Sequence, residues 1–545
     1  MDAVATSMTS KKRKAVKKVC RKVKIKGTKR TRKVCRPVRK KKVVAKKPLI
    51  VIAPARPPVV LPPVTGGGIV AAPSPAAPPV TTPPSPPPAP PPAEPPTAPD
   101  LPVFSATFGV AQAQRLLWRA GFGPKPGEAE ALAGRGVLAA VRSLTRPSGS
   151  ANLAGAAPTV DGAPLAPTDA WGHDHLWWLD RMVRSDQPLV ERMTLIWHDW
   201  LASSNGDVGN ARLMIDQNEL YRRRALGSFA DLLADVTIDP AMLIFLSGIE
   251  NRRQAPNENY ARELMELFTL GADRGAYTET DVRSLARALT GWRTDWTDDG
   301  FANFRFDPNR FDTGSKTLWA GTAHARSGAF NWRDACTLVL ENPFHRSFFV
   351  LKLWSYFVPS PPSASTQAAL EALYISSGYS IGQVVEAILL HPDLYAGAPL
   401  VKPPAVYNAG LLRATGQTIT TDAWVWLGSL SGQQLFHPPN VAGWNDQAWL
   451  DTSRLYGRWN LANTVIRPRV ATNASYAGST ETGAQALARA FDHVGRPALT
   501  SETYTALLAF AEQAQPGGVG SGDFRALRQN ALRQLIATAP DAHLS

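Results

Sequence analysis

The side chains best suited to chemistry in this 545-residue chain occur in polar clusters within aromatic-rich segments. One cluster spans residues 257–264, Asn-Glu-Asn-Tyr-Ala-Arg-Glu-Leu. On a helix, Asn259, Glu263 and Glu266 would share one face, because residues three or four apart are neighbours there. Such a stripe could hold a metal ion or a polyol, or move protons between carboxyl groups. An amphipathic helix with surface ion pairs would show the same pattern. The candidates from this cluster are Glu258 and Glu263 for catalysis, and Asn257, Asn259 and Arg262 for ligand binding.

A second cluster, Trp197-His198-Asp199-Trp200, places a histidine and an acid between two indoles. His198 could act as a general base, or the aromatic rings could form a platform for a sugar. Consecutive residues of a helix point in different directions, so His198 and Asp199 need not act together. The pattern favours the alternative, a core histidine bonded to a backbone group.

A third cluster, His173-Asp174-His175, precedes two further tryptophans. In an extended strand two histidines at this spacing could ligate a metal ion. Here the segment opens a helix, where that spacing separates the rings, and the sequence predicts no metal site.

The fourth cluster runs from His437 to Asn445 and contains two prolines and a glycine before an indole. The prolines restrict the backbone and the glycine permits a tight turn. Such a rigid loop could present His437, Asn440 and Trp444 to a ligand, or it could fill space between helices.

Strong catalytic signatures are missing from the sequence. It has no phosphate-binding G-x-x-x-x-G-K-[ST], no G-x-G-x-x-G, no H-E-x-x-H, no C-x-x-C and no G-x-S-x-G. These absences weigh against nucleotide hydrolases, dinucleotide enzymes, simple zinc proteases and common serine hydrolases.

The charge of the chain is concentrated at one end. Residues 1–56 hold 22 of the 60 Lys and Arg residues and one of the 44 acidic residues, so the remainder is slightly acidic. A basic run of this kind is predicted to be disordered and to bind an anionic polymer, either nucleic acid or an envelope polyanion. The residues chosen to represent that polyanion-binding tail are Lys11, Lys12, Arg13, Lys14, Lys40, Lys41 and Lys42.

The tail also contains a short repeat, because Lys-Val-Cys-Arg occurs at 18–21 and again at 33–36. Alternating residues and a glycine between the copies indicate a marginal hairpin that a disulfide between Cys20 and Cys35 could close. Two free thiols in a disordered tail are the alternative.

Residues 57–102 form a proline-rich linker with 20 prolines and no Lys or Arg. The composition predicts a stiff polyproline-II spacer rather than a folded domain. No signal peptide is visible, and no window has the ~20 apolar residues needed to span a bilayer.

From residue 103 to 545 the pattern changes to helical periods separated by Gly and Pro. All 16 Trp residues lie here, and Cys336 sits in an apolar run typical of a buried residue. We therefore predict a mainly α, multi-helix body. It would have a long irregular loop or small sheet insertion near 295–325 and a C-terminal helical segment at about 480–540.

Six segments in order resemble the bacterial family called domain of unknown function 1800, covering about residues 104–465 and weakly the rest. They are Arg115–Gly123, Glu191–Asp199, Asn257–Gly271, Leu289–Arg293, Lys352–Trp354 and Leu435–Trp444. One departure stands out, since members often have His-Asp-x-Gly-x-Lys where this chain has Phe311-Asp312-Thr313-Gly314-Ser315-Lys316. A catalytic role of that histidine would be lost here, whereas Asp312 remains a candidate.

The resemblance implies an envelope or extracellular location, because many members carry export signals. It also implies a neighbouring sulfatase-like protein as a partner, and it implies no particular reaction or cofactor. The leading interpretation is a cell-envelope-associated binding or accessory protein. The alternatives are a hydrolase that uses the carboxylates of the body, and a cytoplasmic nucleic-acid-associated protein that binds through its tail.

Overall fold

The computed structural model describes residues 18–24, 31–37, 101–297, 300–476, 478–513 and 522–545. Backbone contacts divide the chain into two units, one ending at Pro57 and the other beginning at Pro58. The seven basic residues chosen above and nearly all of the proline-rich linker lie outside the described residues, so their predicted roles stay predictions.

The first unit contains the hairpin expected between the two Lys-Val-Cys-Arg copies. Strand β1 (Lys18–Lys24) pairs antiparallel with β2 (Thr31–Pro37), and Cys20 lies directly opposite Cys35. The disulfide concerns side chains outside the described part of the structure and stays a prediction.

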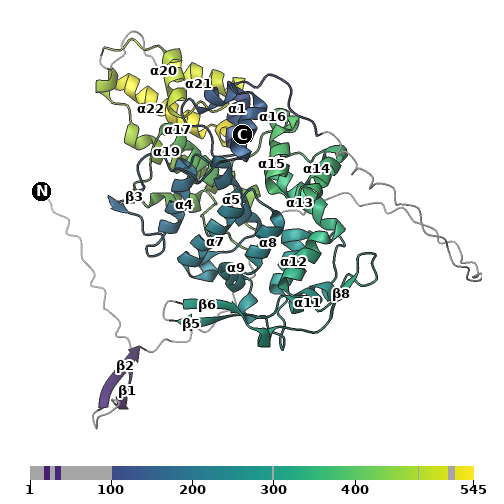
Figure 1. Ribbon diagram of the computed structural model, residues 1–545. Coiled ribbons are helices and arrows are strands. Elements are labelled where there is room, and N and C mark those ends of the chain that lie inside the picture. The colour runs from purple at the N-terminus through teal and green to yellow at the C-terminus, as the bar shows by residue number, and fades with distance from the viewer. Residues whose placement is uncertain (1–17, 25–30, 38–100, 298–299, 477, 514–521) are drawn as a thin grey trace, which may run out of the picture. The chain divides into compact units, whose positions relative to one another are not determined.

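The second unit is mainly α-helical, as the sequence predicts (Figure 1). Its first half contains α1 (Val110–Arg119), α2 (Glu128–Ala133), α3 (Val137–Thr145), α4 (His173–Arg184), α5 (Pro188–Trp200), α6 (Asn205–Val208), α7 (Ala211–Arg224), α8 (Phe229–Thr237), α9 (Pro240–Phe245), α10 (Asn259–Glu263) and α11 (Glu279–Ala288). Its second half contains α12 (Trp332–Glu341), α13 (Pro343–Ser355), α14 (Ala364–Ser376), α15 (Ile381–Leu390), α16 (Pro392–Ala396), α17 (Pro404–Thr415), α18 (Ala423–Leu430), α19 (Thr452–Ile466), α20 (Gly483–His493), α21 (Ser501–Gln513) and α22 (Gly522–Thr538). None of the described helices is long and apolar enough to cross a membrane.

The insertion near 295–325 consists of two antiparallel hairpins. They pair β5 (Trp292–Thr297) with β6 (Gly300–Phe306), and β7 (Lys316–Leu318) with β8 (Arg326–Gly328). Tryptophan, threonine and phenylalanine favour strands because their side chains pack well on a pleated surface. A third, very short hairpin joins β3 (Thr159–Val160) to β4 (Ala163–Pro164).

Local sequence signals explain most helix ends. Thr278 caps α11 by accepting from the backbone N–H of Asp281, and the Asp281 carboxylate accepts from the N–H of Thr278 in return. Glycines separate α2 from α3, because Gly134 ends α2 and Gly136, at φ 74°, precedes α3.

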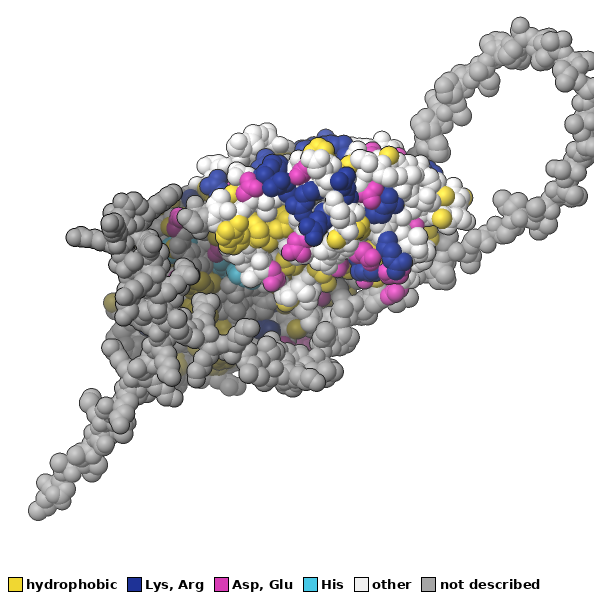
Figure 2. Space-filling model, turned by 90° about the horizontal axis from the view of Figure 1, so that it is seen from below, with side chains coloured by type: hydrophobic (Ala, Val, Ile, Leu, Met, Phe, Trp, Pro, Cys, Tyr) yellow, Lys and Arg dark blue, Asp and Glu magenta, His cyan; other side chains and the backbone are white. Residues whose placement is uncertain are grey.

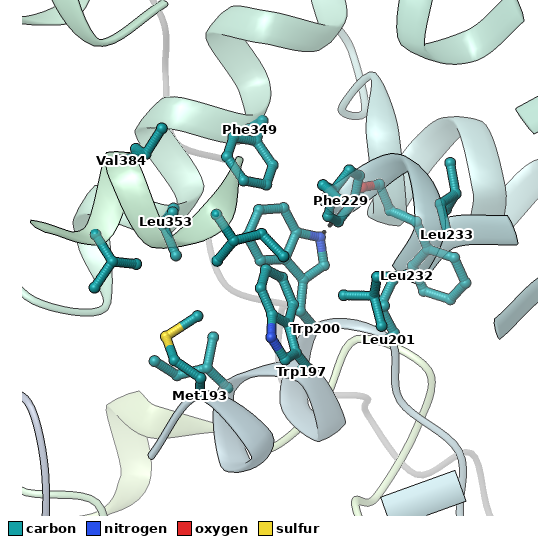
Figure 3. Close-up of a cluster of buried hydrophobic side chains, with 14 of the residues drawn as sticks. Met193, Trp197, Trp200, Leu201, Phe229, Leu232, Leu233, Phe349, Leu353 and Val384 are labelled. Carbon is teal, nitrogen blue, oxygen red and sulfur yellow. Dashed lines mark hydrogen bonds between the residues drawn. The ribbon is translucent and has the colours of Figure 1, made fainter. Parts of the chain in front are cut away.

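The larger of two hydrophobic cores surrounds α5. Figure 3 shows Trp197 and Trp200 on this helix lying between Met193, Phe349 and Leu353 on one side and Phe229 on the other. Their indole N–H groups donate to the carbonyls of Ala225 and Phe268, so both polar atoms are satisfied inside the core. Cys336 is buried in the same core, as predicted, and its thiol contacts the Thr237 hydroxyl.

The second core lies among α4, α17, α18, α19 and α22, and a loop beginning at Leu435 passes along it. Helix α5 belongs to both cores, since Trp197 and Trp200 pack in the first and Leu195 in the second. Its polar residues therefore lie between two apolar layers, where partners must come from elsewhere in the chain.

Candidate functional site

Helix α5 carries His198 and Asp199 in different directions, as expected for consecutive residues. Asp199 accepts hydrogen bonds from the backbone N–H of Trp444 (2.8 Å) and from the hydroxyl of Tyr356 (2.7 Å). His198 is fully buried, and its ring stacks on the indole of Trp444 with the ring centroids 5.6 Å apart. Both residues of the second cluster thus hold the loop that forms the fourth cluster.

The third cluster reaches the same place from the start of α4. His175 accepts a hydrogen bond at Nδ1 from the backbone N–H of Leu435 (3.1 Å). The Asp174 carboxylate accepts from the side-chain amide of Asn205 (3.3 Å), and the backbone N–H of Asn205 donates to the carbonyl of Phe436 (2.8 Å). Three clusters that the sequence shows separately therefore meet in one place. We call the following group the histidine site: Asp174, His175, His198, Asn205, His437 and Trp444.

Burial determines the protonation state of the buried histidines in this site. Loss of hydration, with a smaller contribution from His437, lowers the pKa of His175 and of His198 to about 3 each, so the two rings are neutral. Burial also raises the pKa of Asp174, although the backbone N–H of His175 and the nearby His437 act in the opposite direction.

His437 is half-buried, whereas His175 and His198 are buried. Its pKa is lowered mainly by burial, while Asp174 raises it by favouring the imidazolium form. A β-carbon added at Gly206 would lie 3.9 Å from Nδ1 of His437 and 3.5 Å from the Ser204 hydroxyl, so these polar atoms flank one glycine. His437 is therefore the residue of the site that can exchange a proton with a bound molecule.

Unsatisfied polar atoms gather around His198. The Ser203 backbone lies close enough to raise its pKa, yet neither ring nitrogen has a hydrogen bond of acceptable geometry. Buried polar atoms without partners are rare, and each one requires a water, a ligand or another explanation. The further buried atoms of this kind in the site are Nε2 of His175, Oδ1 of Asn205 and Nε1 of Trp444.

Among the described residues no three His, Cys, Asp or Glu side chains are arranged to hold a metal ion. An ordered water that both donates and accepts would satisfy such unpaired atoms.

The first cluster lies on a helix that changes type. Helix α10 continues as a π-helix, η2 (Leu264–Thr269), so Glu266 does not continue the α-helical stripe of Asn259 and Glu263. Arg262 does not turn toward the His437 loop, because its guanidinium pairs with Glu279 (2.7 Å) and Glu258 (3.3 Å).

Glu263 differs from the other candidates of this cluster. Its side chain is half-buried and has no hydrogen-bond or ion-pair partner within the described ranges. Burial raises its pKa to about 7, with Glu266 adding to the shift and Arg262 opposing it. A carboxyl group with this pKa can donate or accept a proton near neutrality.

Asp312 makes contacts that hold a loop in place. It forms an ion pair with Arg287 (2.7 Å), whose hydrogen bond is the main cause of its lowered pKa, and its backbone carbonyl accepts from Lys316 (2.5 Å). The ring of Phe311, which replaces the histidine frequent in the resembling family, lies 4.9 Å from the Lys316 ammonium. Asp312 and Lys316 thus fix the loop between the two hairpins.

Asn257, Asn259 and Asn440 make local contacts. Asn257 accepts from the backbone N–H of Asn259 (2.9 Å), and Asn440 accepts from that of Ala442 (2.9 Å). Asn440 therefore shapes the turn rather than reaching the first cluster. Sequence reasoning missed Tyr356 and Asn205, which stand outside the four clusters; the nearby Lys352–Trp354 segment was the only signal for Tyr356.

Comparison with known proteins gives a family and no function. The family model described as a protein of unknown function, DUF1800, matches residues 115–543, which includes the C-terminal helices. No curated protein and no solved structure matches the chain. Because the match spans most of the sequence and contains the histidine site, this chain belongs to the DUF1800 family.

Proposed function

We propose that this protein is a cell-envelope-associated binding or accessory protein. Its basic N-terminal tail would hold an anionic polymer, the proline-rich linker would give it reach, and the helical body would engage a ligand or a partner protein. The chemistry of the tail suits teichoic acid and nucleic acid alike, and the family resemblance favours the envelope and a sulfatase-like partner.

The observation that carries the proposal is the division of charge. Twenty-two of the 60 Lys and Arg residues lie in the first 56 positions, whereas the rest of the chain is slightly acidic. Neutralising polymer charges with these cations would release counterions, so binding should be tight at low salt and fall steeply as salt rises.

Support for a binding body comes from the histidine site. His175 and His198 are neutral and buried, and several polar atoms around them lack partners. Selection for stability alone would favour apolar side chains at these positions, or partners that complete the hydrogen bonds of the buried polar atoms.

Deleting residues 1–56 tests the tail. The truncated protein should lose binding to lipoteichoic acid and to duplex DNA but keep the helical circular dichroism spectrum and thermal melt of the full chain. Undiminished polymer binding by the truncated protein would contradict the proposal. Tight DNA binding together with weak lipoteichoic acid binding by the full chain would favour the nucleic-acid alternative.

A hydrolase is the second candidate, and Glu263 favours it. A half-buried carboxyl group with a pKa of about 7 and no partner among the described residues has the properties of a general acid or base. Hydrolysis of p-nitrophenyl acetate, phosphate or β-glucoside that disappears in Glu263→Gln but persists in Glu279→Gln would support this function.

A further inference from the structure

A pocket of about 680 Å³ opens beside the start of α10, away from the histidine site. It lies between the segment that follows η1 (Gly248–Glu250) and the turn η3 (Pro308–Arg310) after β6. Figure 2 views the molecule from the side on which β5, β6 and α11 lie in Figure 1, and Lys and Arg side chains gather there. We call this the arginine pocket, and its polar lining is Glu250, Arg252, Asn257, Glu258 and Arg310.

The positive charges of the arginine pocket are incompletely neutralised. Arg252 and Arg310 have no carboxylate at ion-pair distance among the residues that the structure describes, whereas Glu258 is shared by Arg262 (3.3 Å) and Arg283 (3.5 Å). Glu250 is the remaining acid of the lining, and it is exposed.

These neighbouring positive charges affect the pKa of Arg310. Its pKa is lowered first by burial and then by the neighbouring charges of Arg293 and Arg252, while Asp307 opposes the shift. Its Nε atom is buried without a partner, although one terminal nitrogen donates to the carbonyl of Ile249 (2.8 Å). An added anion would relieve the repulsion between these guanidinium groups.

The pocket is held in shape before any ligand arrives. Asn251 is buried, donates to the carbonyl of Ala286 (2.9 Å) and accepts from the backbone N–H of Asn257 (2.9 Å). The backbone N–H of Arg253 donates to the carbonyl of Arg310 (2.8 Å), which ties the two walls together. A preformed site loses less free energy when it binds a ligand.

We propose that the arginine pocket binds a phosphate or sulfate ester of a polyol. The planar guanidinium group of Arg252 would take two oxygens of the oxyanion with its paired N–H donors, and the remaining terminal nitrogen of Arg310 would donate to it as well. The volume is far larger than a bare oxyanion, and Glu250, Asn257 and Glu258 offer acceptors for hydroxyl groups on the remainder of the ligand. This site goes beyond the proposed function, since it places anion recognition in the body as well as in the tail.

The test uses the full-length protein and its thermal melt at constant ionic strength, with glucose 6-phosphate, glucose 6-sulfate, inorganic phosphate and glucose as probes. The body melt should rise and saturate with either ester, and Arg310→Gln and Arg252→Gln should each weaken that response about tenfold, the value of one charge-assisted hydrogen bond. Ligands that bind only the tail leave the melt unchanged, because they do not favour the folded body.

Arg326→Gln is the matched control, because Arg326 is an exposed arginine on β8 whose side chain, within the described part of the chain, bonds only to the carbonyl of Ala325. Its response should equal that of the wild type. Arg252→Gln guards against misfolding, since Arg252 contacts the loop through its backbone, which the substitution keeps, and its side chain makes no hydrogen bond or ion pair among the described residues, whereas the Arg310 side chain donates to Ile249. Equal ester affinity in Arg252→Gln and Arg326→Gln would overturn the site. An equal response to inorganic phosphate and to the esters would overturn the ester assignment. Deleting residues 1–56 tests polymer binding by the tail, and its outcome is independent of both results for the arginine pocket.

Discussion

The carboxylate of Asp199 accepts a hydrogen bond from the backbone N–H of Trp444, which lies 245 residues further along the chain. The contact needs the glycine that precedes Trp444, because Gly443 adopts φ 88° and a β-carbon there would overlap both Oδ1 and the carbonyl oxygen of Asp199. One helix residue thereby fixes the loop that supplies His437 to the histidine site.

Gly443→Ala should therefore destabilise the protein more than an ordinary glycine substitution. Left-handed backbone alone costs an alanine about 1–2 kcal/mol, and the overlap with Asp199 should add about 1–3 kcal/mol. Urea unfolding followed by circular dichroism measures the loss. Gly416→Ala is the control, since Gly416 has φ 60° and open space around it. Equal losses in the two variants would mean that the loop does not rest on Asp199.

His198→Phe should leave stability within about 1 kcal/mol of the wild type or raise it, because neither ring nitrogen has a hydrogen bond to lose. His345→Phe is the matched comparison. That buried ring bonds to the carbonyl of Thr269 and to the hydroxyl of Tyr374, both at 2.9 Å, and its replacement should cost about 2 kcal/mol or more. A larger loss at His198 than at His345 would show that His198 is an essential structural residue.

The stability of the body should depend on the proton of Glu263. Its pKa is about 7 in the folded protein and near 4.5 when unperturbed, so the folded state holds this proton more tightly. This contribution is fully present below pH 4.5 and is lost as the pH rises through 7. Glu263→Gln keeps a neutral side chain, so its urea midpoint relative to the wild type should increase between these pH values.

Glu279→Gln should behave in the opposite way. The hydrogen bond from Arg262 is the main cause of the lowered pKa of Glu279, so this carboxylate stabilises the fold at neutral pH and loses that effect as the pH falls. If the stabilities of the Glu263 and Glu279 variants, relative to the wild type, changed with pH in the same direction, the opposite pKa shifts assigned to the two carboxyl groups would be refuted.

The hairpin of β1 and β2 should be closed by a disulfide under oxidising conditions, because Cys20 and Cys35 are directly opposite in the register. Peptide mapping of the protein after exposure to oxidised glutathione, without reductant, should give one cross-linked peptide that contains both cysteines. Cys20→Ser should abolish it. Two glutathione adducts in place of the cross-link would show that the hairpin does not bring the thiols together.

Local signals in the sequence were sufficient for most of the helices. The Thr278–Asp281 capping box and the Pro404 start of α17 act within a few residues, so the sequence predicts them directly. The insertion at 295–325 was recognised because its residues lack a helical period, and it is a pair of hairpins. The π-turn after Glu263 could not be predicted, because its neighbours Leu264 and Met265 suit an α-helix equally well.

The histidine site shows the limit of such reasoning. His175, His198 and His437 were each recognised, but their meeting depends on contacts such as His175 with Leu435, which are 260 residues apart. The sequence around a residue does not indicate which residue so far along the chain it will contact. Ion pairs such as Arg262 with Glu279 were hidden for the same reason.

The π-helix at Leu264–Thr269 has a consequence for how this region can change in evolution. A π-turn contains about one residue more than an α-turn, and each residue of a helix turns the chain by about 100°. Losing a single residue here would restore an ordinary α-turn and leave the residues on either side in phase with the core, whereas the same loss inside the α-helix α5 would rotate one end by about 100°. A change in chain length should therefore be tolerated at this π-turn more readily than in the neighbouring α-helices.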